Sequence, residues 1–410
     1  MPSIFKAVRR CVVVYLGTVF LCTAVLAQSS AGGETLRPEV QKHLQSAQDA
    51  LKAGQSEQAF TMARLALKPA QLTVFELTWI HRVLGAAAFA AKEMDQAVQS
   101  FSYLVTQSGL TSSEKRPFLE RLIALSQQNK DHAKMVHWSR QYLTEGGANP
   151  MVRLVLVQTL SYLNAHEDLV REVQVQLQLD AAEKRKPNQV FLRLMAVSQR
   201  ELKRFNDYEA TLWSLLENYP SKEYWREVIE RQAQKNHVNP RLELDFYRLL
   251  EETDNLNGTD EYIEMAQLAI KSGMPAEALR VLNSGFEKAV FSQGPEGAEQ
   301  AKLKLQAQGH SEKDSKVLEH LEKSAQNGNE FAALADAYLS KRQWAQAVVF
   351  YDKALRMGGL RRPAEVQLHS GIALIKSGDP EKAQKVFAQI HDEPTALVLA
   401  KLWLLRGLAL

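Results

Sequence analysis

The side chains best suited to catalysis or metal binding in this sequence are its ten histidines and several adjacent carboxylates. His166-Glu167 begins like a helix that binds zinc, but the position of the second ligand is Val170, which cannot coordinate a metal. His132 and His137 are five residues apart, a spacing that directs them to different sides of a helix. Adjacent carboxylates such as Glu251 and Glu252 are typical of a charged helix surface. We therefore predict no catalytic residue, no metal site and no cofactor.

The sequence also lacks the patterns that bind phosphate groups or nucleic acids. It has no Gly-rich loop that ends in Lys-Ser or Lys-Thr, and no dinucleotide-binding fingerprint. The chain carries 50 Lys and Arg against 47 Asp and Glu, but Lys6, Arg9 and Arg10 lie in the first 27 residues, which contain no acidic residue. The rest of the chain is electrically neutral. Its charge gives no basis for binding nucleic acid, and no small-molecule substrate is evident.

Residues 1–27 have the layout of a secretory signal peptide, with a basic start, the uncharged apolar run Cys11–Ala27 and a polar sequence after it. The alternative is an uncleaved anchor in the inner membrane, although the run is shorter than the ~20 residues that usually span a bilayer. Both cysteines, Cys11 and Cys22, lie in this leader. A mature chain without cysteine excludes disulfides, thiolate metal ligands and thiol nucleophiles. We predict a periplasmic protein that contacts the membrane only if the leader is retained.

From Pro38 onward the sequence predicts helices that repeat with a period of about 34 residues. Apolar residues recur at three- and four-residue spacing, and alternating stretches are scarce. Prolines are favoured at helix starts. They recur after 33, 37 and 33 residues at Pro117, Pro150, Pro187 and Pro220. A period of this length indicates an array of helical hairpins.

Each well-defined period contains a small residue, an alanine twelve positions later and an aromatic residue four positions after that. The copies are Gly371–Ala383–Phe387, Ala335–Ala347–Tyr351 and Gly85–Ala97–Phe101. The small residues permit a close helix crossing, and the aromatic ring fills the gap to the next hairpin. This spacing resembles the tetratricopeptide repeat (TPR), most strongly at 331–354 and 365–390 and most weakly at 115–236. The resemblance implies an all-α superhelical solenoid of ten or eleven TPR-like hairpins.

A narrower resemblance concerns the C-terminal half. The segments 219–228 and 358–387, and the polar segment 292–309, are similar to parts of bacterial envelope repeat proteins that accompany TonB–ExbB–ExbD systems. This resemblance implies a non-enzymatic periplasmic scaffold or adaptor, with TonB, ExbB, ExbD or a TonB-dependent receptor as partner. The alternatives are a membrane-anchored envelope assembly factor, for polysaccharide export or outer-membrane biogenesis, and a ligand-binding or enzyme subunit.

The repeat pattern divides the chain into six predicted segments. They are a signal peptide at 1–27, a polar linker at 28–36, an N-terminal TPR-like array at 37–291 with a degenerate middle, a polar hinge or irregular hairpin at 292–329, regular TPRs at 330–394 and an apolar capping helix at 395–410. The hinge is predicted because residues 292–329 are polar and lose the pattern of small and aromatic residues.

Partners of such arrays are expected in the inner groove, which the first helix of each hairpin lines. The repeat register assigns eight residues to this groove: Trp79, Arg82, Phe89, Asp336, Leu339, Leu368, Ile372 and Ile375. The alternative is that these residues pack within the superhelix. The last helix carries Trp403, Leu404 and Leu408 on an unusually apolar surface. It either caps the preceding hairpin or contacts a partner, a second copy or a membrane.

Overall fold

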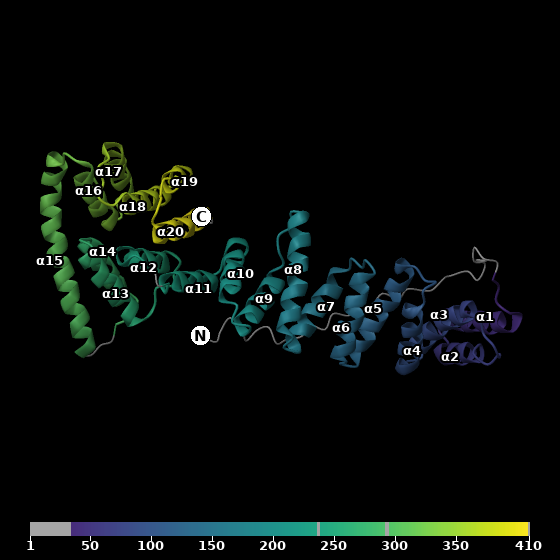
Figure 1. Cartoon of the computed structure of the whole chain (residues 1–410). Helices are drawn as coiled ribbons and strands as arrows, with labels where there is room; N and C mark the ends of the chain where they lie inside the picture. The colour runs from purple at the N-terminus through teal and green to yellow at the C-terminus, as the bar shows by residue number, and fades with distance from the viewer. Residues whose placement is uncertain (1–33, 236–237, 292–294, 409–410) are drawn as a thin grey trace. The chain divides into compact units, whose positions relative to one another are not determined.

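The computed structural model describes residues 34–235, 238–291 and 295–408 (Figure 1). The predicted signal peptide and both cysteines lie outside the described residues. The described residues form 20 α-helices and one short 3₁₀ helix, with no strand among them. The predicted all-α repeat fold is therefore confirmed.

The helices belong to two compact units. Unit 1 extends to Tyr208 and unit 2 begins at Glu209. The division falls inside α10 (Phe205–Asn218), whereas the sequence suggested a hinge at 292–329.

Unit 1 is a series of consecutive helix pairs. Its helices are α1 (Pro38–Lys52), α2 (Ser56–Leu65), α3 (Val74–Ala90), α4 (Met94–Thr106), α5 (Ser112–Gln128), α6 (His132–Thr144), α7 (Pro150–Tyr162), α8 (His166–Ala182) and α9 (Gln189–Glu201). The members of each pair pack on each other and on the next pair, so their apolar faces form a continuous core.

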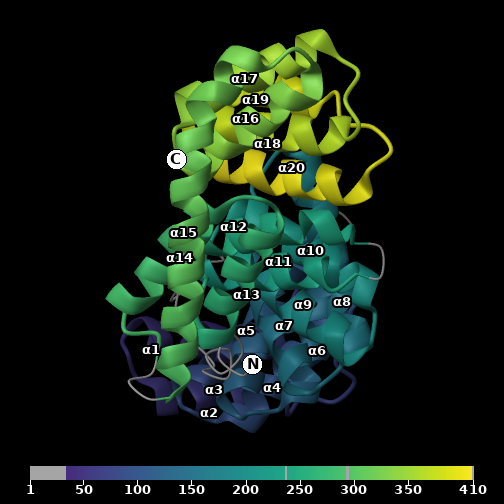
Figure 2. The ribbon, with the colours of Figure 1, turned by 90° about the vertical axis from the view of Figure 1, so that its left-hand side faces the viewer.

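Unit 2 contains further helix pairs and two helices outside the repeat. Its pairs are α11 (Lys222–Ala233) with α12 (Glu243–Glu252), α13 (Gly258–Lys271) with α14 (Pro275–Glu287), α16 (Gly328–Ser340) with α17 (Trp344–Met357), and α18 (Pro363–Lys376) with α19 (Pro380–Phe387). The other two helices are α15 (Pro295–Ser324) and α20 (Pro394–Leu408). Figure 2 shows α15 running alongside the helices of this unit, from α13 and α14 to α16 and α17.

The predicted contact between small residues and aromatic rings is confirmed. A Cβ atom added to Gly85 would lie 2.6 Å from the Phe101 ring, and one added to Gly371 would overlap the Phe387 ring. Both rings are buried. Only glycine allows the first helix of each of these hairpins to approach the aromatic residue of the second.

Two local expectations require correction. Pro117 does not begin a helix but lies inside α5, whose start is fixed instead by a capping box between Thr111 and Glu114. The segment 292–329 contains no irregular hairpin, because its described part is one helix of 30 residues, α15. This long helix belongs to no hairpin, so the described residues form fewer hairpins than the ten or eleven that the period predicts.

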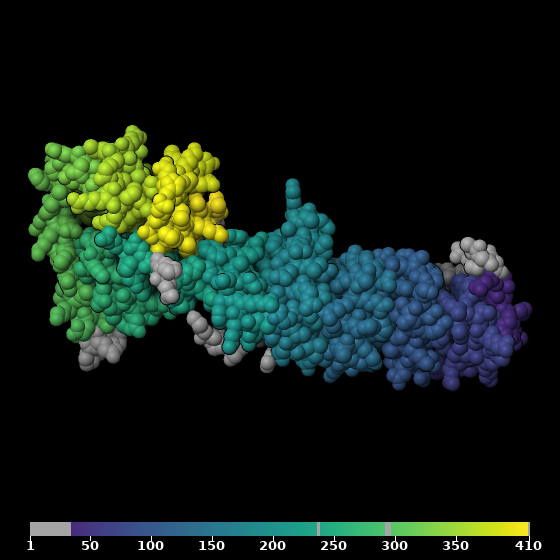
Figure 3. Space-filling model, viewed as in Figure 1, coloured from purple at the N-terminus to yellow at the C-terminus, as the bar shows by residue number. Residues whose placement is uncertain are grey.

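The last helix, α20, packs on α18, α19 and α12 within unit 2. Its buried side includes Leu399, Leu402 and Trp403. In Figure 3 its yellow atoms lie directly against neighbouring helices of that unit. Among the described residues, no helix combines the length and the apolar character needed to cross a membrane.

Candidate interaction face and charged junction

The first helices of the second and third hairpins carry a set of partly exposed aromatic and arginine side chains. We call this set the α3–α5 face: Trp79, Arg82 and Phe89 on α3, and Phe118 and Arg121 on α5. The α3 residues are three and seven positions apart and therefore share one side of the helix. Three residues of the predicted groove thus lie together.

Cation–π contacts join the members of this face. The Arg82 guanidinium carbon lies 5.4 Å from the centre of the Trp79 ring and 5.9 Å from that of Phe118. Arg121 lies 5.2 Å from the centre of the Phe89 ring. These contacts fix the rings of two successive repeats at one surface.

The buried core supports this face from below. The Phe118 ring stacks on Phe101, with 5.9 Å between ring centres, and Phe101 in turn fills the space opposite Gly85. The residues that define the repeat therefore also hold the partly exposed Phe118 ring in place.

A capping carboxylate fixes the arginine of the face. Arg82 Nη2 donates to Glu114 Oε1 at 2.8 Å. Glu114 also accepts from the backbone N–H of Thr111, at the start of α5. Burial alone would raise the pKa of Glu114, but the hydrogen bonds from Thr111 and Arg82 outweigh it and lower that pKa. The carboxylate stays charged, and Arg82 keeps its orientation.

The other five predicted groove residues lie in unit 2, in a different environment. Leu339, Leu368, Ile372 and Ile375 are buried, and Asp336 is partly buried. They are covered because α14 packs against α16 and α20 packs against α18, while hydrogen bonds to His369 link α12 to α18. The structure thus places these four apolar residues in the interior of unit 2 and not on an open groove.

At this place unit 2 contains a group of charged side chains that sequence reasoning did not identify. We call it the charged junction: Asp245 and Arg248 on α12, Glu277 on α14, Asp336 on α16 and His369 on α18. Arg248 donates to Asp245 Oδ1 at 2.8 Å and to Glu277 Oε2 at 2.6 Å. Except for Asp336, these residues are almost fully buried.

His369 on α18 connects the carboxylate of Asp336 on α16 with that of Asp245 on α12. Its Nδ1 lies 3.0 Å from Asp336 Oδ1, and its Nε2 lies 3.3 Å from Asp245 Oδ2. Burial alone would lower the pKa of His369, but Asp245 and Asp336 outweigh it and raise that pKa to about 10. The raised pKa favours the protonated ring, which can donate to both carboxylates, and the Arg248 guanidinium also lies 3.3 Å from Nε2.

The ionisation states of the residues around His369 complement its positive charge. Burial would raise the pKa of Asp245, but His369 and Arg248 keep it below the usual value. The hydroxyl of Tyr351 donates to Asp336 Oδ1 at 2.6 Å, and burial and Asp336 together raise the pKa of Tyr351 well above its usual range. Tyr351 is thus a neutral donor, and the junction holds its charges in a fixed pattern.

A second layer of ion pairs surrounds the junction. Glu251 accepts from Arg280 Nη2 at 2.8 Å and from Arg342 at 3.3 Å. Glu252 accepts from Lys376 at 2.8 Å and lies 3.7 Å from Arg406. The sequence contains one indication of the charged junction: Arg248 and His369 each lie among apolar residues, as buried polar residues do. It does not indicate which residues they contact, because those partners are mostly remote in the sequence.

The three residues predicted on the last helix have different environments. Trp403 is buried, Leu404 is partly exposed and Leu408 is 78% exposed. The apolar surface is therefore divided: one side caps the preceding hairpins, whereas Leu397 near the start and Leu408 at the end are exposed.

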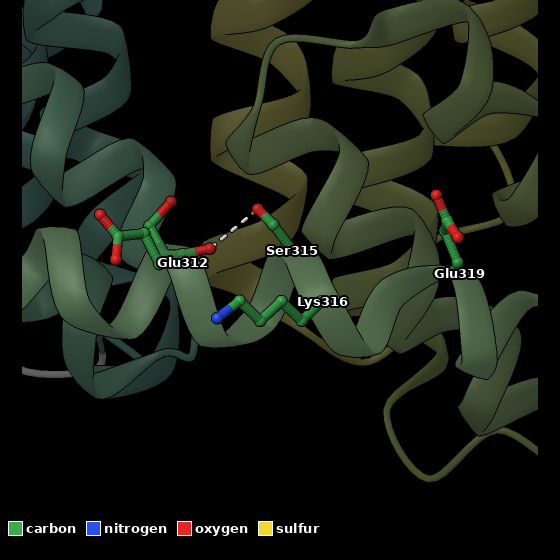
Figure 4. A pocket seen from close by; sticks show the side chains of 5 residues that line it. Glu312, Ser315, Lys316 and Glu319 are labelled. Atoms are coloured by element: carbon green, nitrogen blue, oxygen red, sulfur yellow. Dashed lines mark hydrogen bonds between the residues drawn. The ribbon is translucent and has the colours of Figure 1, made fainter.

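Two further observations concern possible ligand sites. A shallow depression of about 590 Å³ is lined by Ser311, Glu312, Ser315, Lys316 and Glu319. Figure 4 shows these side chains along α15, which supplies all of them, so they do not converge on one point. Within the described ranges, no three His, Cys, Asp or Glu side chains are arranged to hold a metal ion.

Comparison with known proteins gives similarity at the level of solved structures. No family model matches the chain, and no curated protein sequence matches it significantly. A tetratricopeptide repeat protein from Parabacteroides merdae is 10% identical, with 82% of this chain and 100% of that chain covered and a TM-score of 0.31. Yeast Tom70 is 9% identical, with coverages of 88% and 95% and a TM-score of 0.23. The pentatricopeptide repeat protein PPR10 from maize is 12% identical, with coverages of 90% and 61% and a TM-score of 0.27.

These whole-chain TM-scores are low, and the assignment of the fold does not depend on them. It depends on this chain's own paired helices and on the close contacts of Gly85 and Gly371 with aromatic rings. The chain is an all-α repeat protein of tetratricopeptide-like architecture.

Proposed function

We propose that this protein is a non-enzymatic scaffold that binds other proteins through the α3–α5 face. The observation that carries the proposal is the fixed array of partly exposed aromatic and guanidinium groups on two successive repeats. Trp and Arg are the residue types most often found at the energetic centres of protein interfaces. Their immobilisation by Phe101 and Glu114 lowers the entropic cost of binding.

The chemistry of the face indicates the kind of partner segment. Aromatic rings held by guanidinium groups bind apolar side chains, and a surface extending over two repeats accommodates an extended segment or one face of a helix. In our proposal the partner therefore binds to unit 1, at the α3–α5 face.

We further propose that the protein works in the periplasm as an adaptor in a TonB-linked transport system. Two sequence features support this proposal: the signal-peptide pattern at 1–27, and the similarity of 219–228 and 358–387 to proteins that accompany TonB–ExbB–ExbD. The expected partners are TonB, ExbB, ExbD or a TonB-dependent receptor.

The test is crosslinking in intact cells, followed by purification of the protein and mass spectrometry of what remains attached. Enrichment of the TonB-linked components supports both parts of the proposal. Enrichment of polysaccharide-export or outer-membrane assembly proteins would agree with a scaffold function but contradict the TonB-linked role. It would indicate an envelope assembly factor instead. N-terminal sequencing of the purified chain then shows whether the leader is cleaved after Ala27 or retained as an anchor.

A further inference from the structure

A small cavity lies inside unit 2, beside the charged junction. Its volume is about 30 Å³, enough for one or two particles of the size of a water molecule. Four cations line it: Arg248, Arg280, Arg342 and Lys376. The other lining residues are Glu251, Glu252, Glu277, Leu339, Ser340, Trp344, Ile372 and Trp403.

Two buried N–H groups that belong to residues lining this cavity have no hydrogen-bond acceptor among the described residues. They are Trp403 Nε1 and Arg280 Nε. Trp403 is 3% exposed, and both Trp403 and Arg280 line the cavity. Buried donors without an acceptor are rare in folded proteins, and an unseen water or ion is a common reason for them.

The side chains that line the cavity also carry one more positive than negative charge. Four cations face three carboxylates, Glu251, Glu252 and Glu277. These carboxylates already accept hydrogen bonds from arginine or lysine. An excess of positive charge around a partly buried site favours the binding of an anion.

We propose that this cavity binds a monatomic anion, chloride or a similar halide. Such an ion accepts from Trp403 Nε1 and its neighbours without donating, and it supplies the missing negative charge. A water molecule would bring two protons of its own into a site rich in donors. The small volume favours a single monatomic ion over phosphate or sulfate.

The bound anion would join parts of unit 2 that are far apart in the sequence. The cavity is lined on one side by α12 and α14, and on the other by α16, α18 and α20. Anion binding would therefore stabilise the packing of these helices on one another. This role is independent of the proposed partner face, which lies in unit 1.

The direct test is X-ray diffraction from crystals of the whole protein soaked in sodium bromide. We expect an anomalous bromide peak within hydrogen-bonding distance of Trp403 Nε1. Bromide peaks only at the protein surface, or a weakly scattering water in the cavity, would overturn the proposal.

The test in solution compares sodium chloride with sodium gluconate at constant ionic strength. We expect the midpoint of thermal unfolding to rise by about 3 to 5 °C for each tenfold increase in chloride above its dissociation constant. Trp403→Phe removes the unpaired indole N–H and should abolish the chloride-specific rise in the unfolding midpoint. Trp344→Phe is the matched control, because Trp344 lines the same cavity without a buried orphan N–H. A rise of equal size in gluconate, or full retention of it in Trp403→Phe, would contradict the proposal.

Discussion

Raising the pH should weaken unit 2, because it removes the proton that His369 holds between two carboxylates. The pKa of His369 is about 10 in the folded protein, against 6.5 for an ordinary histidine. A group whose pKa is raised by folding contributes its full stabilisation below the unfolded value and loses it as the pH rises through the folded value. A tenfold change in proton affinity corresponds to about 1.4 kcal/mol. The expected loss between pH 6.5 and 10 is therefore about 3 to 5 kcal/mol.

The assay is urea unfolding followed by tryptophan fluorescence, at constant ionic strength, between pH 6.5 and 9. His369→Gln should lower the free energy of unfolding at pH 6.5 and flatten its dependence on pH. His320→Gln is the control, because His320 lies exposed on α15 in the same unit. A wild-type stability that does not change over this range would refute the reasoning, as would a His320→Gln profile as flat as that of His369→Gln.

Three further predictions concern the repeat packing and the buried charges. Gly371→Ala should cost about 1 to 3 kcal/mol in thermal unfolding, because the new Cβ overlaps an aromatic ring, whereas Gly309→Ala in the open side of α15 should be neutral or stabilising. Arg248→Met removes the nearest cation of two buried carboxylates, Asp245 and Glu277, and should cost about 3 to 5 kcal/mol in urea unfolding, against at most ~1 kcal/mol for Arg226→Met at a partly exposed pair. The pKa of Glu76 is held at about 2, chiefly by its hydrogen bond to an arginine, so stability should fall as the pH drops from 4.5 toward 2; Glu76→Gln should remove that part of the acid dependence in denaturation at pH 3 and 6.

The local architecture could be predicted from the sequence because each repeat is specified within about 34 residues. Gly85 and Phe101 are 16 positions apart, as are Gly371 and Phe387, and both contacts are present. The location of Trp79 and Arg82 on one side of α3 also follows from spacing along a single helix. Patterns of this kind depend only on the helical period, which the sequence displays directly.

The charged junction could not be predicted, because its pairs are remote in the sequence. His369 lies 124 positions from Asp245, and Lys376 is equally far from Glu252. No periodic pattern specifies such pairs. Other helices of unit 2 also cover Leu368 and Ile372. The repeat register correctly places these two residues on the first helix of a hairpin, but it does not show that other helices pack against that helix.

Site-specific photocrosslinking in living cells tests the interaction face most directly. A photoreactive phenylalanine analogue is placed at Trp79 or Phe118 in the α3–α5 face, or at Gln99, an exposed position on the second helix α4 of the same hairpin as Trp79. The proposal predicts crosslinks to the same partner protein from Trp79 and Phe118 and none from Gln99. Equal crosslinking from all three positions, or crosslinking from Gln99 alone, would contradict it.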